Sequence, residues 1–366
     1  MTTPPQAPAS RQDPLLSVRD LQVGFDSPAG IVTAVDGVSF DLEAGRALGV
    51  VGESGSGKTV LSRVIMNLLT VSNRRPIDGE VRFRGQNLLT TRRRELRKLW
   101  GDDLAMVFQD PMTSLNPTMK IGAQVTESLY LHRKISRKAA RARAEELLEE
   151  VGIPDPARRL NQYPHELSGG MRQRVTIAIA LACDPVLLIA DEPTTALDVT
   201  VQAQILDLLD RQRTHRQMGL ILISHDLGVV EGRTDHVNVM YAGRVVESAP
   251  TSAVFARPRH PYTESLIASM PRIDDPSHTR LAAIPGHPPH PLNRPTGCKY
   301  APRCQYAQPR CLDEDPELMR PTDEESDRGT ACFFPPGTDR GEQALARNRT
   351  AGHTATGLEL QPMEVR

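Results

Sequence analysis

Residues 168–198 read SGGMRQRVTIAIALACDPVLLIADEPTTALD, and no other stretch of the chain says as much about the fold. The stretch opens with Ser168–Gly170 at the start of a helical pattern, where free N–H groups and the helix dipole favour an anion. It continues with the apolar strand 186–190, which ends in Asp191 and Glu192. Ligands of open α/β sheets bind at the carboxyl ends of the strands. Asp191 is therefore a candidate Mg²⁺ ligand and Glu192 a candidate general base.

A second signature lies far upstream, where residues 52–59 read GESGSGKT. The pattern of Gly, four residues and Gly-Lys-Ser/Thr is that of a phosphate-binding loop, in which glycine lets the backbone turn its N–H groups toward phosphate oxygens. Lys58 is expected to contact the β- and γ-phosphates, and the Thr59 hydroxyl to ligate Mg²⁺. An apolar strand precedes the loop and a helical pattern follows it, which argues against a chance match. The expected nucleotide contacts here are Gly52, Ser54, Gly55, Ser56, Gly57, Lys58 and Thr59.

Composition bounds the class of protein. The 366 residues carry 44 Lys and Arg against 45 Asp and Glu, a net charge of -1, so no nucleic-acid partner is expected. The basic cluster 92–98 is expected to be a solvated helix face. No apolar run reaches the length of a membrane span, and residues 1–14 lack the apolar core of a secretory signal, so they are expected to form a disordered tail. We therefore expect a cytoplasmic location and reduced cysteines.

The order of patterns predicts an α/β fold. Two alternating strands come first, and after residue 168 strands and helices alternate, as in a parallel sheet with crossover helices. A helical insert at about 110–168 interrupts the series. The expected elements are strands 16–25, 32–42, 47–51, 80–84, 104–108, 186–190 and 219–223, helices 58–69, 170–182 and 200–217, and a helical region from 117 to about 151.

The composition changes near residue 255. Prolines crowd the region that follows and exclude long helices except near 262–269. Four of the five cysteines fall between 298 and 332, and the polar residues 335–366 are expected to be disordered. We expect a main unit over 15–255 and a small extension over 256–334.

Taken together, these motifs resemble those of an ATP-binding-cassette (ABC) ATPase. The resemblance covers about residues 15–255, and its wording is most similar to that of the dipeptide and oligopeptide permease ATPases. It implies a P-loop NTPase fold with a RecA-like parallel sheet, an antiparallel β subdomain and a helical insert. The residues that carry it are Gly52–Thr59, Gln109, Leu167–Met171, Asp191 and Glu192, Ala196–Asp198, and His225.

The resemblance also implies roles for single residues. Gln109 would bind Mg²⁺, sense the γ-phosphate and report to membrane subunits, and His225 would hydrogen-bond the γ-phosphate; a lone histidine by itself more commonly has a structural role. Phe25 stands where the family stacks an aromatic ring on adenine, although an ordinary strand position explains it nearly as well. Asp198 belongs to the nucleotide contacts, and Met171 replaces a glutamine that many cassettes have.

In this family the helix start at Ser168, Gly169 and Gly170 binds the γ-phosphate of the ATP held by another cassette. A chain with one phosphate-binding loop and one such helix start needs a partner, which in peptide importers is typically a related but distinct ATPase. The resemblance further implies two transmembrane permease subunits and an extracytoplasmic substrate-binding protein. It places the chain peripherally on the cytoplasmic face of the membrane.

The cysteines have the spacing C-x5-C-x6-C-x20-C, which is wider than that of usual zinc sites or ferredoxin runs. By spacing alone, free thiols, zinc and an iron–sulfur cluster stay open. The sequences HPYT at 260–263 and GCKYAPRC at 297–304 resemble the C-terminal extension of peptide-permease ATPases, some of which bind a [4Fe–4S] cluster. The resemblance implies such a cluster as a structural staple, with a redox sensor as the alternative. Its ligands would be Cys298, Cys304, Cys311 and Cys332, while Cys183 is expected to be a buried apolar residue.

The sequence thus predicts an ATPase that drives uptake of dipeptides or oligopeptides. Nickel complexes and oligosaccharides are alternative cargoes within the subfamily. A soluble cassette that acts on nucleic acid or ribosomes is a further alternative. Such proteins typically carry two cassettes or a long coiled-coil insertion, and this chain shows neither.

Overall fold

The computed structural model describes residues 13–69, 77–110, 114–195, 197–271, 283–320 and 327–360. Its core is a seven-stranded sheet in the order β11-β10-β9-β3-β8-β7-β6. The five strands from β9 to β6 run parallel, while β10 and β11 are antiparallel additions at one edge. The strands are β3 (Ala47–Val51), β6 (Leu104–Val107), β7 (Leu187–Asp191), β8 (Gly219–Ser224), β9 (His236–Tyr241), β10 (Arg244–Pro250) and β11 (Gly329–Thr330).

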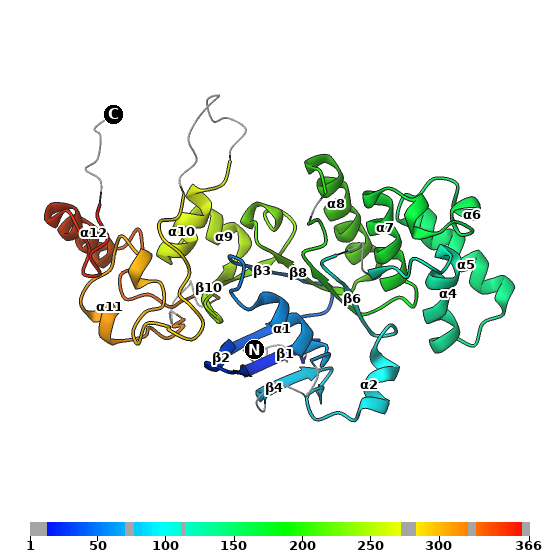
Figure 1. Ribbon diagram of the computed structural model, residues 1–366, viewed down its shortest axis with the longest axis horizontal. Helices are drawn as coiled ribbons and strands as arrows, with labels where there is room; N and C mark the ends of the chain where they lie inside the picture. The colour runs from blue at the N-terminus through cyan, green and yellow to red at the C-terminus, as the bar shows by residue number, and fades with distance from the viewer. Residues whose placement is uncertain are drawn as a thin grey trace, which may run out of the picture.

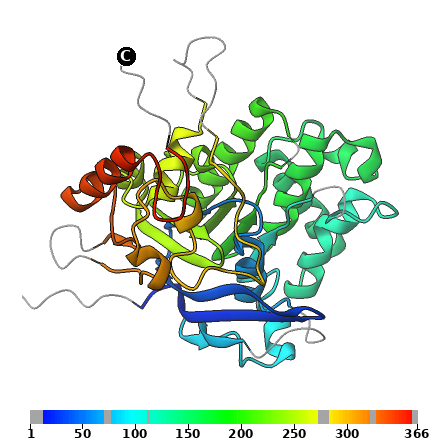
Figure 2. The ribbon, with the colours of Figure 1, turned by 60° about the vertical axis from the view of Figure 1, so that its left-hand side comes forward.

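A second, antiparallel sheet has the order β2-β1-β4-β5 and lies along one side of the core (Figure 2). Its strands are β1 (Leu16–Ser27), β2 (Gly30–Leu42), β4 (Asp78–Phe83) and β5 (Gln86–Asn87). Leu187 and Ile189 of β7 pack in one apolar cluster with this sheet and with α1 (Lys58–Ile65). Leu188 and Ala190 belong to the cluster on the opposite face. Both faces of β7 are therefore covered, which explains its uninterrupted apolar run.

Helices lie beside the central sheet as well as at both ends of the molecule (Figure 1). The helical insert lies at one end and the C-terminal extension at the other, with the sheets between them. No helix in the described ranges is long and apolar enough to cross a membrane. Before the extension the helices are α2 (Arg93–Leu99), α4 (Ile121–His132), α5 (Arg137–Glu150), α6 (Pro156–Arg159), α7 (Gly169–Ala180) and α8 (Val199–Arg216), with short turns η2 (Pro164–Glu166) and η3 (Leu227–Val229). After them come α9 (Thr251–Ala256), α10 (Pro261–Ala268), η4 (Ala301–Arg303), α11 (Arg310–Asp313) and α12 (Asp339–Ala351).

The C-terminal region corrects one expectation. Residues 335–366 do not form a disordered tail as a whole, because α12 occupies part of them. Thr338 caps this helix by accepting from the Gly341 N–H at 3.1 Å, and Ala344 and Leu345 are buried. The expected disorder of 1–12 and 361–366 lies outside the described residues.

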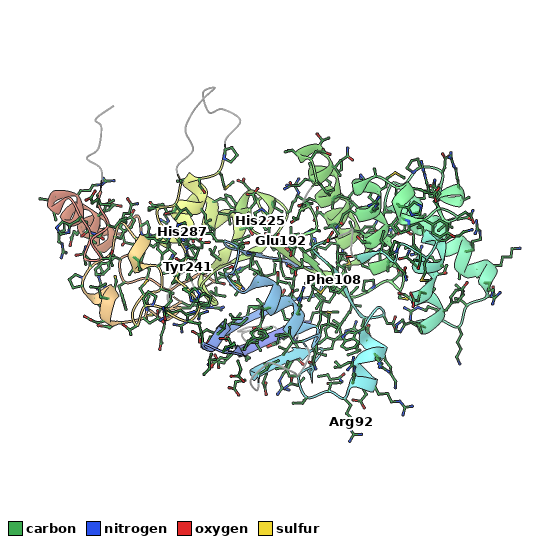
Figure 3. The ribbon with its side chains drawn as sticks, viewed as in Figure 1. Arg92, Phe108, Glu192, His225, Tyr241 and His287 are labelled. Carbon is green, nitrogen blue, oxygen red and sulfur yellow. The ribbon has the colours of Figure 1, made fainter. Side chains whose placement is uncertain are left out.

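The extension is also less separate than its composition suggests. Strand β11 pairs with β10, so residues of the extension continue the core sheet. The basic residues of α2, and Arg92 directly before it, are exposed, as expected for a solvated helix face. Arg92 points outward in Figure 3.

Candidate active site

The loop between β3 and α1 needs glycine at two positions. Gly52 has φ 155° and Gly57 has φ 101°. A Cβ added at Gly52 would collide with the carbonyl oxygen of Met240, and one added at Gly57 with that of Ala34. Backbone carbonyl groups therefore lie against the loop at both positions, and only glycine fits at Gly52 and Gly57.

Lys58 begins α1 and points back into the loop. Its ammonium donates to the carbonyl oxygens of Gly52 at 2.6 Å and Glu53 at 3.0 Å. Burial lowers the pKa of Lys58, while the carboxylates of Glu192 and Asp191 oppose that shift. A buried cation held by carbonyl dipoles can exchange them for phosphate oxygens, which bind it more strongly.

Asp191 ends β7 directly beside this loop. The Thr59 hydroxyl donates to Asp191 Oδ1 at 3.3 Å and the Ser62 hydroxyl to Oδ2 at 3.2 Å. Burial raises the pKa of Asp191, and the two hydroxyl hydrogen bonds oppose the rise. A carboxylate and a hydroxyl together are oxygen donors of the kind that Mg²⁺ prefers. Sequence reasoning did not single out Ser62.

Three polar side chains contact the carboxylate of Glu192, the residue that follows β7. Its Oε2 accepts from Gln109 Nε2 at 2.9 Å and from the Thr195 hydroxyl at 3.0 Å, and it lies 3.2 Å from His225 Nδ1. Glu192 itself has φ 48°, a left-handed conformation that costs a non-glycine residue about 1 kcal/mol and is found at functional sites. Figure 3 shows Glu192 and His225 together near the centre of the molecule. Thr195 is a partner that the motifs did not reveal.

A cavity of about 310 Å³ opens beside this carboxylate, with Glu192, Ser224 and His225 in its wall. The side chain of His225 is 57% exposed, whereas that of Glu192 is 9% exposed. The predicted acid–base residue is therefore shielded while the histidine faces solvent. An arrangement of this kind can hold a water between a buried base and a bound phosphate.

The second phosphate motif lies at the exposed starts of α7 and α8. Ser168 caps α7 by accepting from the Met171 N–H at 3.3 Å, and Asp198 caps α8 by accepting from the Val201 N–H at 2.9 Å. A Cβ at Gly170 would approach Val201 Cγ1 to 2.9 Å, so the glycine lets the two helices meet. Both Ser168 and Asp198 are exposed.

The remaining predicted contacts lie nearby or in the antiparallel sheet. Ser56 is buried and its N–H donates to the Glu53 carbonyl at 3.2 Å, whereas Ser54 and Gly55 are exposed at the tip of the loop. Phe25 pairs with Val32 in the β1–β2 ladder, is half-buried and packs against the apolar cluster of that sheet.

The four predicted cysteine ligands do come together. They line one small pocket in the extension, and Cys304 and Cys311 are buried. Burial raises the pKa of the Cys298 thiol to about 11 and that of Cys304 well above its usual value. Within the described ranges, no three His, Cys, Asp or Glu side chains are arranged to hold a metal ion. The donor set thus fits a metal cluster, but the thiol positions do not form its coordination geometry. Cys183 is buried in the apolar core, as expected.

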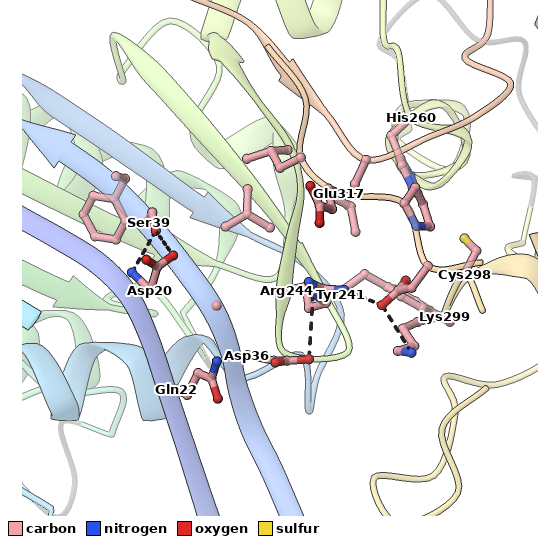
Figure 4. A pocket seen from close by; sticks show the side chains of 18 of the residues that line it. Asp20, Gln22, Asp36, Ser39, Tyr241, Arg244, His260, Cys298, Lys299 and Glu317 are labelled. Carbon is pink, nitrogen blue, oxygen red and sulfur yellow. Dashed lines mark hydrogen bonds and ion pairs between the residues drawn. The ribbon is translucent and has the colours of Figure 1, made fainter. Parts of the chain in front are cut away.

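A separate cavity of about 810 Å³ lies between the antiparallel sheet and the extension (Figure 4). Several of its charged side chains form ion pairs with one another. Arg244 pairs with Asp315 and lies 3.8 Å from Asp36, and Lys299 lies 3.3 Å from Asp315. Its described lining contains no residue of the loop 52–59. This cavity is therefore separate from the candidate active site.

Comparison with known proteins places this site in a family. The family model described as ABC transporter matches residues 35–195, and that described as oligopeptide/dipeptide transporter, C-terminal region, matches residues 246–311. The oligopeptide transport ATP-binding protein OppD of Bacillus subtilis is 50% identical over 309 residues, which cover 84% of this chain and 86% of the relative. The chain belongs to the ABC transporter family. Its group is that of the oligopeptide and dipeptide transport ATP-binding proteins.

Other similarities agree with this membership. OppD of Escherichia coli K12 is 48% identical, with 88% of this chain and 94% of the relative covered. Among solved structures, the cassette MJ0796 in its dimeric form bound to ADP and Pi has a TM-score of 0.58 at 26% identity and covers 64% of this chain and 98% of that one. CbiO1 of Clostridium perfringens has a TM-score of 0.56 at 28% identity, with 67% and 92% covered. The α/β P-loop NTPase fold with an ABC cassette, predicted from the motifs, is confirmed, and the family's activity is ATP hydrolysis coupled to transport.

Proposed function

We propose that this protein is the ATP-hydrolysing subunit of an importer for dipeptides or oligopeptides. The observation that carries the proposal is the convergence of Gln109, Thr195 and His225 on Glu192, beside the buried Lys58. The match of residues 246–311 to the oligopeptide/dipeptide transporter C-terminal region supports peptides as the cargo.

In the proposed reaction Lys58 binds the β- and γ-phosphates of ATP. Glu192 accepts a proton from water while the water oxygen bonds to the γ-phosphorus and the bond to the β–γ bridging oxygen breaks. His225 hydrogen-bonds the γ-phosphate and orients the carboxylate of Glu192. Thr59, Asp191 and Gln109 would hold Mg²⁺, which neutralises charge on the phosphates when bound.

The exposed helix start at Ser168–Gly170, together with Asp198, is proposed to bind the ATP held by a second cassette. In this proposal the loop binds ATP in the single chain, and the helix start contacts a nucleotide only when two cassettes face one another. We propose that the second cassette is a different protein. ATP binding closes the pair, and hydrolysis opens it.

The permease subunits are proposed to dock on an apolar groove between the core sheet and the helical insert. This groove has a volume of about 290 Å³, and its wall includes Trp100, Met106, Phe108 and Ile179. Phe108 is 44% exposed and directly precedes Gln109, so a docked segment would lie next to a residue that contacts Glu192. This docking would place the protein peripherally on the cytoplasmic face of the membrane, with an extracytoplasmic binding protein on the other side.

We also propose a [4Fe–4S] cluster in the extension as a structural staple, for which the shared pocket of Cys298, Cys304, Cys311 and Cys332 is the support. Burial raises the pKa of Cys298, Cys304 and Cys332, so a cluster would have to offset the cost of deprotonating these thiols. Iron and sulfide analysis of anaerobically purified protein, with its visible absorption spectrum, tests this directly. Four iron atoms per chain are expected; zinc or metal-free thiols would refute the cluster.

The cargo is tested by assembling this chain with its permease subunits, the second cassette and the binding protein. Dipeptides or oligopeptides added with the binding protein should raise ATP turnover, whereas nickel complexes and oligosaccharides should not. Stimulation by either of those cargoes instead would refute peptide import. Stimulation by nucleic acid or ribosomes would support the soluble alternative.

A further inference from the structure

Two residues of the C-terminal extension hydrogen-bond to Glu53, the second residue of the phosphate-binding loop. Its backbone N–H donates to the Tyr262 hydroxyl at 2.7 Å. Its carboxylate accepts two hydrogen bonds from the Arg303 guanidinium, at 2.8 Å and 3.0 Å. A two-bond pair of this kind fixes direction as well as distance.

Arg303 is itself rigidly held. Its side chain is 4% exposed, and its Nε donates to the Pro285 carbonyl at 2.8 Å. One terminal nitrogen donates to the Tyr241 hydroxyl at 3.3 Å, and the guanidinium lies 5.9 Å from the ring centroids of both Tyr241 and Tyr300. The extension thus presents a fixed cation to the loop, and a fixed partner loses little entropy when it forms an ion pair.

Glu53 also contacts Lys58, so the extension is linked to Lys58 through Glu53. The Glu53 carbonyl accepts from the Lys58 ammonium at 3.0 Å, so both peptide groups of Glu53 are fixed, one by Tyr262 and one by Lys58. The Glu53 side chain is 26% exposed, so its charge is only partly screened by water. Without Arg303, an unpaired carboxylate would stand in the loop that receives the phosphates, where it would repel them and compete for Lys58.

We propose that Arg303 is a positioning residue for ATP binding, which neutralises Glu53 and holds it in place so that the extension completes the phosphate-binding loop. The proposal rests on the proposed function only in that this loop binds ATP. It assigns a task in the nucleotide site to the extension, independently of what its cysteines bind.

The test replaces Arg303 by methionine, which keeps an unbranched side chain and removes the charge. We expect the Kd for ATP, titrated on the full chain, to rise about tenfold, which corresponds to about 1.4 kcal/mol. In the assembled transporter the KM for ATP should rise while kcat stays within about twofold. The double variant Glu53→Gln/Arg303→Met has no unpaired charge and should regain most of the affinity. Arg347→Met, an exposed position on α12, is the matched control and should bind ATP like the wild type.

A second variant distinguishes a positioning role of Arg303 from an effect on folding. Tyr262→Phe removes only the hydroxyl oxygen that accepts from Glu53, and we expect it to raise the Kd about threefold, as for one lost hydrogen bond. This variant keeps the test decisive if Arg303→Met does not fold. Wild-type affinity in both variants, or a loss that Glu53→Gln does not rescue, would overturn the proposal. Failure of the wild type to bind ATP would instead refute the proposed function.

Discussion

Replacing Glu192 by glutamine is the sharpest perturbation of the proposed chemistry. The change keeps the shape of the side chain and removes its negative charge together with its ability to accept a proton. The donors Gln109 and Thr195 both point at Oε2, at 2.9 Å and 3.0 Å. An amide oxygen can accept the same two hydrogen bonds, so the Glu192→Gln side chain should keep its position.

A general base contributes about 10²–10⁴ in rate. We expect kcat for ATP hydrolysis to fall by that factor, which corresponds to about 2.7–5.4 kcal/mol of lost transition-state stabilisation. The Kd for ATP should stay within about twofold of the wild-type value, because neither Lys58 nor the loop is changed. The assay combines phosphate release at saturating ATP with nucleotide titration on the same preparations.

Glu231→Gln provides the matched control, since Glu231 is exposed and lies outside the lining of the active-site cavity. It should hydrolyse ATP like the wild type. Normal hydrolysis by Glu192→Gln would show that another group accepts the proton. A large loss of ATP affinity in that variant would show that the carboxylate holds the loop together instead.

The site and the extension lead to four more expected outcomes. Lys58→Ala should raise the Kd for ATP at least about tenfold, because a charge-assisted contact is lost; unchanged affinity in a nucleotide titration would contradict its role. Ser168→Arg should leave the Kd of the isolated chain for ATP unchanged and abolish ATP-dependent pairing with the second cassette, as followed by light scattering. Pairing at wild-type levels would count against the shared site. Phe108→Asp should preserve ATP binding and prevent co-purification with the permease subunits, and retained co-purification would exclude the groove. Cys304→Ser should lower the free energy of unfolding by about 1–3 kcal/mol, as expected for a buried hydroxyl without a partner, with kcat per folded molecule preserved; altered turnover at unchanged Tm would favour a redox sensor.

Local pattern predicted the parts of the fold that are local in origin. The apolar run of β7 and its two terminal carboxylates define a strand covered on both faces, and the structure has Asp191 at the end of β7 with Glu192 directly after it. The glycines of the loop reflect close backbone approach, which the motif encodes. Long-range contacts have no such local pattern in the sequence. Glu53 and Arg303 meet across 250 residues, and nothing near either of them indicates the pair.

Short or weakly patterned elements were missed for related reasons. Strand β11 has two residues, too few to show a period, and it forms because β10 offers an edge. Helix α12 is polar in composition, and its burial of Ala344 and Leu345 with the Thr338 cap secures it against the extension. The family resemblance predicted Gln109 and His225 at the γ-phosphate, and the structure brings both to Glu192; separate polar residues that follow different strands carry no shared local signal.

The central claim is that ATP hydrolysis at Glu192 and Lys58 drives peptide import. It is tested most directly by uptake of a labelled oligopeptide into vesicles that contain the assembled transporter, with ATP supplied on the side of this chain and the binding protein on the other. The account predicts ATP-dependent accumulation with the wild-type chain and none with Lys58→Ala. Equal accumulation with Lys58→Ala, or none with the wild type while ATP is hydrolysed, would contradict it.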